Sequence, residues 1–178
     1  SSAFWGDSQG KAAPWEIVLD LANATDADAW LNLPYQADDD YVLRAAQLTK
    51  ERLEPGRRII LEYTNEVWNT VMPYEKGGSE IERQAKAAWP SDRSSDLEKR
   101  LSWHGKRSVE ICRIWKKEFG SEASRITCTM GGQSGWDWIS EQMLDCPVWV
   151  RNGGKRCADE MDALAVAPYF GAPYDAKG

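Results

Sequence analysis

The chain has 178 residues, 42% hydrophobic and 28% charged, which is the composition of one globular domain spanning residues 1–178. Its net charge of -6 disfavours a nucleic-acid partner, because acidic side chains repel phosphate. No apolar run approaches the roughly 18 residues of a membrane span, so we expect no membrane partner either.

The first third of the chain alternates between helical and extended patterns. Pro14 opens a helix whose apolar residues recur at helical spacing. We expect a short strand at residues 28–34 and then a helix over residues 38–53, which begins with three aspartates and ends at Pro-Gly. The apolar run at residues 59–69 predicts a buried strand.

The remaining two thirds continue the alternation. The patterns predict a loop at residues 69–78, helices at 79–89 and 96–119 (the second capped by Asp96), a strand at 125–130, a loop at 131–135, a helix at 136–144 and a strand at 162–169.

Strands that alternate with helices are typical of a parallel sheet covered on both faces. No Gly-rich phosphate loop follows a strand, which disfavours a doubly wound nucleotide-binding fold. We therefore predict an α/β fold of the (β/α)₈ barrel type, whose sites gather where the strands end. Those ends carry polar and aromatic residues, among them Asn32, Tyr35, Asn65, Glu66, Gln133 and Tyr169.

The four cysteines lack the C-x-x-C spacing of a metal site, so we expect no metal. Cys146 and Cys157 flank a loop with the turn sequence Asn152-Gly153-Gly154, which predicts a disulfide and an exported protein. The alternative is a cytosolic protein with four buried free thiols, since Cys112 and Cys128 have the sequence context of core positions.

Three other motifs have structural interpretations. His104 is the only histidine, and we expect a structural or surface role for it on the long helix. Ser134 lacks the G-x-S-x-G spacing of a nucleophile elbow. The aspartates at 38–40 lack the alternation of a calcium loop and are expected to cap a helix.

Asn65-Glu66 at the end of a strand resembles the fourth-strand signature of the clan of retaining glycoside hydrolases built on (β/α)₈ barrels. The sequence around it is similar to bacterial, often multidomain proteins labelled cellulose-binding or hydrolase-like. The similarity extends over residues 14–171 and rests on three blocks: Leu-Ala-Asn-Ala-Thr at 21–25 with Leu-Asn-Leu-Pro at 31–34, Glu-Tyr-Thr-Asn-Glu-Val-Trp-Asn at 62–69, and Asp-Ala-Leu-Ala-Val-Ala-Pro-Tyr-Phe-Gly at 162–171.

The resemblance implies roles for individual residues. Glu66 would protonate the leaving glycosidic oxygen and then activate water, and Asn65 would bond the sugar 2-hydroxyl. Tyr169 would lie near the nucleophile. Independently of the resemblance, Glu62 lies four residues before Glu66 on the same strand face, and it is either a buried partner of Glu66 or a structural residue. Further candidates for substrate contact are Asn32, Tyr35, Trp68, Gln133, Trp136 and Trp138.

The resemblance also implies that this chain covers only about the third to sixth barrel strands. The nucleophile would be a glutamate beyond residue 178, and the rest of the barrel or another chain would complete the fold. We expect a secreted bacterial glycoside hydrolase that needs no cofactor and cleaves a β-linked polysaccharide or oligosaccharide, with a cellulose-like glucan favoured. The alternative is a non-catalytic carbohydrate-binding or scaffolding barrel.

Overall fold

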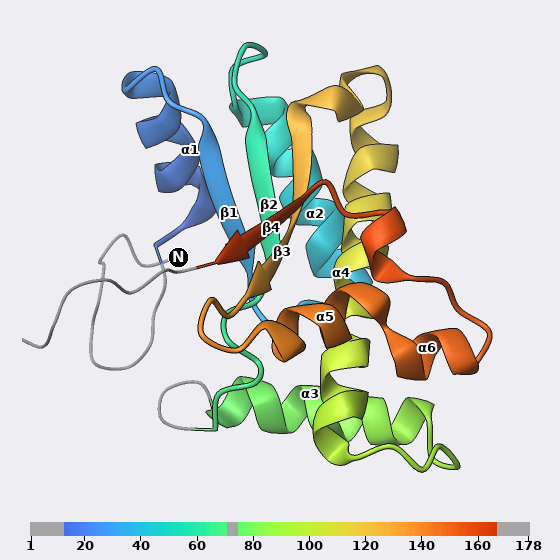
Figure 1. The fold of residues 1–178 in the computed structure, drawn as a ribbon. Helices are drawn as coiled ribbons and strands as arrows, with labels where there is room; N and C mark the ends of the chain where they lie inside the picture. Colours follow the sequence, from blue (N-terminus) through green and yellow to red (C-terminus); the bar gives the residue numbers. More distant parts are fainter. Residues whose placement is uncertain (1–12, 71–74, 167–178) are drawn as a thin grey trace, which may run out of the picture.

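A four-stranded parallel sheet forms the centre of the computed structural model, which describes residues 13–70 and 75–166. Its strands β1 (Ala29–Leu33), β2 (Ile59–Tyr63), β3 (Ile126–Gly132) and β4 (Ala163–Val166) lie side by side in chain order (Figure 1). Each pair is parallel, and at least one helix connects each strand to the next. The predicted α/β class is confirmed.

Helices cover one face of this sheet. The helices α1 (Trp15–Ala24), α2 (Asp39–Arg52), α4 (Asp96–Phe119) and α5 (Asp137–Asp145) contact one another in that order. They cover the strand face that carries Leu31, Leu61 and Cys128, which are adjacent in register and buried. The remaining helical elements are α3 (Glu75–Ala88), α6 (Pro147–Arg151), η1 (Gly120–Arg125) and η2 (Cys157–Asp159).

The opposite face, here called the open face, carries Trp30, Asn32, Ile60, Glu62 and Thr129. No helix covers it within residues 13–70 and 75–166, and Trp30 is 55% accessible. The expectation of a sheet covered on both faces is therefore wrong for the described residues. The alternating burial of β1 is the pattern of a strand with only one face in the core.

Several element boundaries differ from those expected. The strand predicted at residues 59–69 ends at Tyr63, because Thr64 and Glu66 adopt left-handed backbone conformations. Helix α3 begins at Glu75, four residues before the predicted start. The N-cap of α4 is Ser95 rather than Asp96: the Ser95 side chain accepts from the Glu98 amide in a capping box.

Two disulfides hold the second half of the chain. Cys146 is bonded to Cys157, as the intervening turn sequence predicts, although helix α6 occupies part of the expected loop. Cys112 is bonded to Cys128, which corrects the alternative of free thiols and joins α4 to β3. All four cysteines are thus paired.

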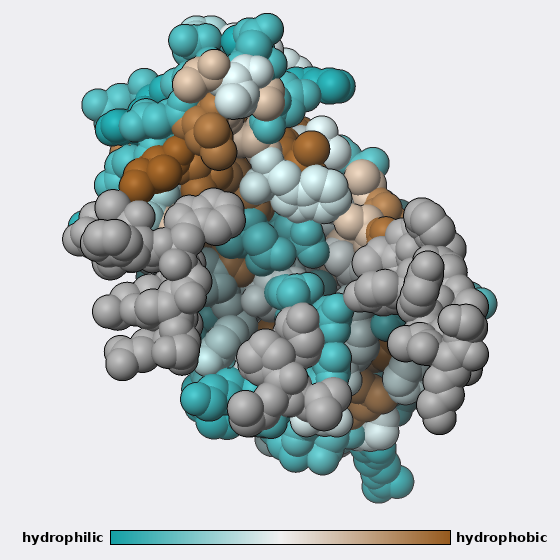
Figure 2. Space-filling model, turned by 90° about the vertical axis from the view of Figure 1, so that its left-hand side faces the viewer, coloured by the Kyte–Doolittle hydropathy of each residue, from teal (hydrophilic) through white to brown (hydrophobic). Residues whose placement is uncertain are grey.

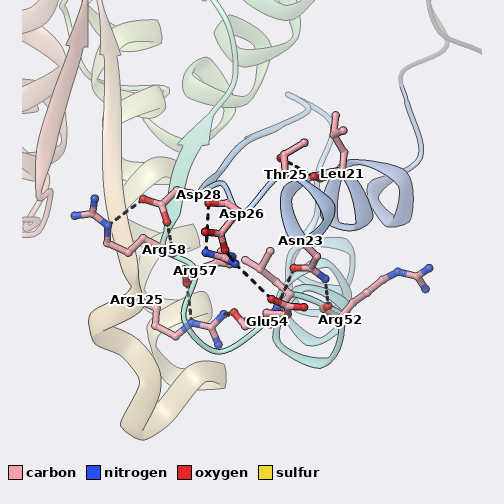
Figure 3. Close-up of polar contacts among 11 residues, drawn as sticks. Leu21, Asn23, Thr25, Asp26, Asp28, Arg52, Glu54, Arg57, Arg58 and Arg125 are labelled. Atoms are coloured by element: carbon pink, nitrogen blue, oxygen red, sulfur yellow. Dashed lines mark hydrogen bonds and ion pairs between the residues drawn. The ribbon is translucent and has the colours of Figure 1, made fainter.

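A polar network connects the amino-terminal ends of the strands (Figure 3). Arg57 pairs with Asp26, and Arg58 pairs with Asp28 at 3.1 Å. Arg125 donates to the carbonyl oxygens of Leu53, Glu54 and Arg57. The network connects the α1–β1 turn, the α2–β2 turn and the start of β3, so it aligns the strands from the end opposite their carboxyl termini.

The side of the molecule with α1 and β1 presents apolar surface. Figure 2 shows hydrophobic residues gathered in the upper part of this side, where α1 lies in Figure 1. Leu21 of α1 and Trp30 of β1 are each 55% accessible.

Among the described helices, none is both long and apolar enough to cross a bilayer.

Candidate active site at the carboxyl end of the sheet

A shallow pocket of about 170 Å³ lies on the open face near the carboxyl ends of the strands. All four strands, or the loops that follow them, contribute to its wall. The lining residues are Trp30, Glu62, Asn65, Glu66, Trp68, Gly131, Gly132, Ala165 and Val166.

The lining shows that the sheet is curled. Trp30 belongs to β1 and Ala165 to β4, the two outer strands, and both line this one small pocket. In a flat sheet these strands would lie three spacings apart, roughly 14 Å. The open face is therefore concave at this end, and it gathers side chains from strands that are distant in sequence.

Glu62 lies at the centre of the pocket wall. The Trp30 Nε1–H donates to Glu62 Oε2 at 2.9 Å. The other oxygen, Oε1, lies only 2.6 Å from where a Cβ on Gly131 would be, so the glycine makes room for the carboxyl. Burial raises the pKa of Glu62, and the hydrogen bond from Trp30 opposes this shift in part. The carboxyl group of Glu62 thus keeps its proton to a higher pH than an exposed glutamate does.

Glu66 lies in the turn that follows β2 rather than in the strand. Its φ is 46°, and Thr64 two residues earlier has the same value. Non-glycine residues in this region cost about 1–3 kcal/mol each and persist only where their surroundings enforce them. Asn69 Nδ2 donates to Glu66 Oε2 at 2.9 Å, and the Asn69 amide donates to the Glu66 carbonyl at 2.9 Å. The carboxylate is therefore held by its own loop.

Helix α4 holds the same loop, residues 64–69, from behind. His104 Nε2 lies 2.6 Å from the Tyr63 carbonyl oxygen, and Arg100 Nη1 donates to the Val67 carbonyl at 3.3 Å. Because a carbonyl only accepts, Nε2 of His104 carries the proton. His104 and Arg100 are one helical turn apart on α4, so they fix both the start and the middle of the loop.

The environment of His104 is apolar. The ring stacks on that of Tyr63 at 5.6 Å, and Nδ1 is buried without a hydrogen-bond partner among the described residues. Burial lowers the pKa of His104 to about 4, against a smaller opposing effect of the bond to Tyr63. Burial likewise raises the pKa of Tyr63 to about 12. His104 is thus a neutral structural residue, which agrees with the structural role of the two expected for it and not with the surface role.

Helix α3 approaches the loop closely at Gly78. A Cβ on Gly78 would lie 2.9 Å from the Val67 carbonyl oxygen and 2.9 Å from Arg100 Nη1. A side chain there would push α3 away from the loop or displace the arginine. The glycine therefore has a packing role in the helix, where the sequence alone suggests a loop.

The structure brings together only some of the residues predicted for the site. Asn65, Glu66 and Trp68 line the pocket. Asn32 lies on the open face beside Glu62 in register but outside the lining.

The other candidates lie elsewhere. Tyr35 accepts a hydrogen bond from the Tyr63 hydroxyl through its carbonyl and lines two other grooves. Gln133 accepts from the Gly135 amide in the β3–α5 loop. Trp136 stacks on Trp138 at 5.8 Å, also outside the pocket. Tyr169 lies outside the described residues.

Sequence reasoning missed Trp30 and the two glycines of the wall. Because a loop was expected at residues 131–135, Gly131 and Gly132 were not predicted as strand residues. In the structure both belong to β3. The alternation of β1 could have placed Trp30 on the same face as Asn32. Its hydrogen bond to Glu62 depends on the register between β1 and β2, which no local pattern specifies.

One grouping of potential metal ligands occurs in the described part of the chain: Cys112, Cys128 and Asp162. Both sulfurs are joined in a disulfide and are not available as thiolates. This grouping lies on the helix-covered face, away from the pocket.

Comparison of the chain with protein-family models, with curated proteins and with solved structures gave no match.

Proposed function

We propose that this chain is part of a retaining glycoside hydrolase that acts on a β-linked polysaccharide, with a cellulose-like glucan as the favoured substrate. The observation that carries the proposal is the pocket in which Asn65, Glu66 and Glu62 meet at the carboxyl end of a curled parallel sheet. Glycoside hydrolysis needs carboxyl groups at the scissile bond, and barrel enzymes hold theirs at this end of the strands.

The strand arrangement supports a (β/α)₈ barrel, of which the four strands would be about the third to the sixth. The four strands follow one another in chain order and the helices lie on one face, which is the arrangement of a barrel wall. In a doubly wound sheet, by contrast, the strand order reverses. The curl that lets β1 and β4 share a pocket supports the same proposal. The open face would then be the inner face of the barrel.

In the proposed mechanism, the protonated Glu66 carboxyl gives its proton to the glycosidic oxygen while a nucleophilic carboxylate bonds to the anomeric carbon. The bond from that carbon to the leaving oxygen breaks. The Glu66 carboxylate then removes a proton from water, whose oxygen bonds to the anomeric carbon and releases the nucleophile. Asn65 would bond the 2-hydroxyl, and Trp68 would supply an apolar face to the sugar.

The resemblance places the nucleophile on a later barrel strand, so further elements would complete the site. The exposed apolar surface beside β1 and the open face are where the rest of the barrel, or another chain, would pack. The two disulfides fit an oxidising compartment, and we propose that the protein is exported.

The test is Glu66→Gln in the complete protein that contains this chain, assayed with β-glucans and mannans against the complete wild-type protein. We expect loss of turnover by a factor of about 10²–10⁴, because the amide cannot donate the catalytic proton. Glu141→Gln, on the exposed surface of α5, is the matched control and should keep full activity. Unchanged turnover in Glu66→Gln would contradict the assignment of Glu66 as the acid/base residue. Tight binding without turnover by the complete wild-type protein would favour the carbohydrate-binding alternative.

A further inference from the structure

Glu62 is a second carboxyl in the pocket, and the proposed mechanism does not use it. Its Oε2 accepts from the Trp30 indole, while no donor from the described residues reaches Oε1. No lysine or arginine of the described chain forms an ion pair with it. A half-buried carboxylate with one neutral donor and no cation is an unfavourable arrangement.

The position of Oε1 is specific. It lies over the backbone of Gly131, where any side chain would displace it, and both residues line the pocket. The indole of Trp30 fixes the other oxygen. The carboxyl is therefore held through Oε2, and Oε1 receives no hydrogen bond from a side chain of the described residues.

Few charged groups face Glu62. From β1 the neighbours are Trp30 and Asn32, from β3 Thr129 and Gly131, and from β4 Ala163 and Ala165, which carry no charge. The loop after β2 contributes one titratable group, Glu66. Burial and the lack of a cation among these neighbours both favour a proton on Glu62.

We propose that Glu62 is a specificity residue of this pocket: it binds the substrate as a neutral carboxylic acid, donating a hydrogen bond from Oε1 to a sugar hydroxyl oxygen. Trp30 and Gly131 are its positioning residues: the Trp30 indole N–H donates to Oε2, and Gly131 leaves room for Oε1. The proposal rests on the proposed function for the nature of the ligand. It does not depend on whether Glu66 transfers a proton.

The experiment measures binding of cellopentaose, mannopentaose and xylopentaose by calorimetry, in the full chain carrying Glu66→Gln. That background prevents turnover and, within the described residues, removes the only other titratable group of the pocket lining. Glu62→Gln is then added as the neutral isostere, which keeps a donor, and Glu62→Ala as the truncation. Circular dichroism and the thermal midpoint establish that each variant is folded.

We expect Glu62→Gln to bind the preferred pentasaccharide within about threefold of its parent at low pH, and Glu62→Ala to bind at least about tenfold more weakly. The parent should lose affinity as the pH rises through the titration of Glu62, whereas Glu62→Gln should bind independently of pH. This is the result for a carboxyl that acts in its neutral form.

Two results overturn the proposal while leaving the proposed function intact. Equal binding by Glu62→Ala shows that the carboxyl makes no contact. Equal weakening by Glu62→Gln and Glu62→Ala shows that the ionised form is the one that binds. If the Glu66→Gln protein binds none of the three pentasaccharides, the carbohydrate function and the Glu62 proposal fall together. Binding with the expected pattern, in a protein whose wild type shows no turnover, supports Glu62 and contradicts only the catalytic step.

Discussion

The position of the Glu62 carboxyl depends on Gly131, because a side chain on Gly131 would occupy the same space. In Gly131→Ala the new methyl would lie 2.6 Å from Oε1, so the carboxyl must move away from the indole of Trp30. We expect the Trp30 indole N–H resonance to shift toward that of an unbonded indole, and pentasaccharide affinity to fall roughly tenfold. Both are measured by titration in NMR spectra.

Gly56→Ala is the control for this prediction, because a Cβ on Gly56 meets nothing within 4 Å. It should leave the Trp30 resonance unchanged. A Gly131→Ala protein whose Trp30 resonance does not move would show that the carboxyl does not depend on the glycine.

His104 gives the protein an acid-sensitive core position. Burial lowers its pKa from 6.5 to about 4, so the unfolded chain takes up a proton before the folded chain does. Its contribution to stability is complete above pH 6.5 and is lost as the pH falls toward 4, by roughly 3 kcal/mol. In His104→Gln, which keeps a donor for the Tyr63 carbonyl, this loss should disappear.

The measurement is urea unfolding of both proteins at pH 7 and pH 4. Carboxylates contribute to the pH dependence of both, so the difference between the two proteins isolates His104. Equal losses of unfolding free energy in the two proteins would contradict the assignment.

At the scale of elements, α4 is the support of the loop at residues 64–69. Arg100→Met would leave the Val67 carbonyl without its donor and Glu82 without one of its cations. Loss of such a buried bond costs about 1.5–3 kcal/mol. We expect hydrogen exchange of the Asn69 amide, which donates to Glu66, to accelerate by about tenfold or more.

Val109→Ala is the comparison, since it removes buried methyl groups from α4 without touching a bond to the loop. It should lower global stability but leave the local opening of the loop unchanged. Equal acceleration at Asn69 in both variants would show that α4 acts only through overall stability.

Some elements were predictable from local sequence, whereas others, such as the end of β2, were not. Helices α1, α2 and α4 follow local signals. Helix α1 begins directly after Pro14, and the ranges expected for α2 and α4 agree with the structure to within a residue, although the cap of α4 is Ser95. The end of β2 is set by left-handed residues that are not glycine, held by contacts from α4. Such tertiary contacts leave no periodic pattern in the sequence.

The candidate site was predictable to a similar degree. Glu66, Asn65 and Trp68 are adjacent in sequence, so a motif was enough to place them in the pocket. Trp30 and Gly131 reach Glu62 only through strand register and the curl of the sheet. Distant candidates such as Tyr35 lie near strand ends but point into other grooves.

At the scale of the whole molecule, two disulfides stabilise the half of the chain that follows β2. One joins α4 to β3, and the other joins the α5–α6 junction to η2. Replacing Cys112 and Cys128 with alanine opens a loop with a sequence separation of 16, which should cost about 3 kcal/mol. For a chain of this size, that lowers the thermal midpoint by roughly 6–12 °C. Calorimetry of the variant measures the shift.

Cys146→Ala with Cys157→Ala, which opens a separation of 11, is the parallel variant and should show a similar decrease. Treatment of the wild-type protein with a reducing agent should lower the midpoint further than either variant. A midpoint unaffected by reduction would show that the disulfides do not contribute to stability.

The chain-order sheet also has a consequence for how such a protein can have grown. Because β1 and β4 are the two outer strands of the described sheet, a new strand–helix unit could be added at either side without breaking an existing pairing. A gene that duplicates such units in tandem would lengthen the sheet step by step, and the inherited curl would bring its outer strands toward each other. Closure would then be a geometric result of repetition rather than a rearrangement of the original strands.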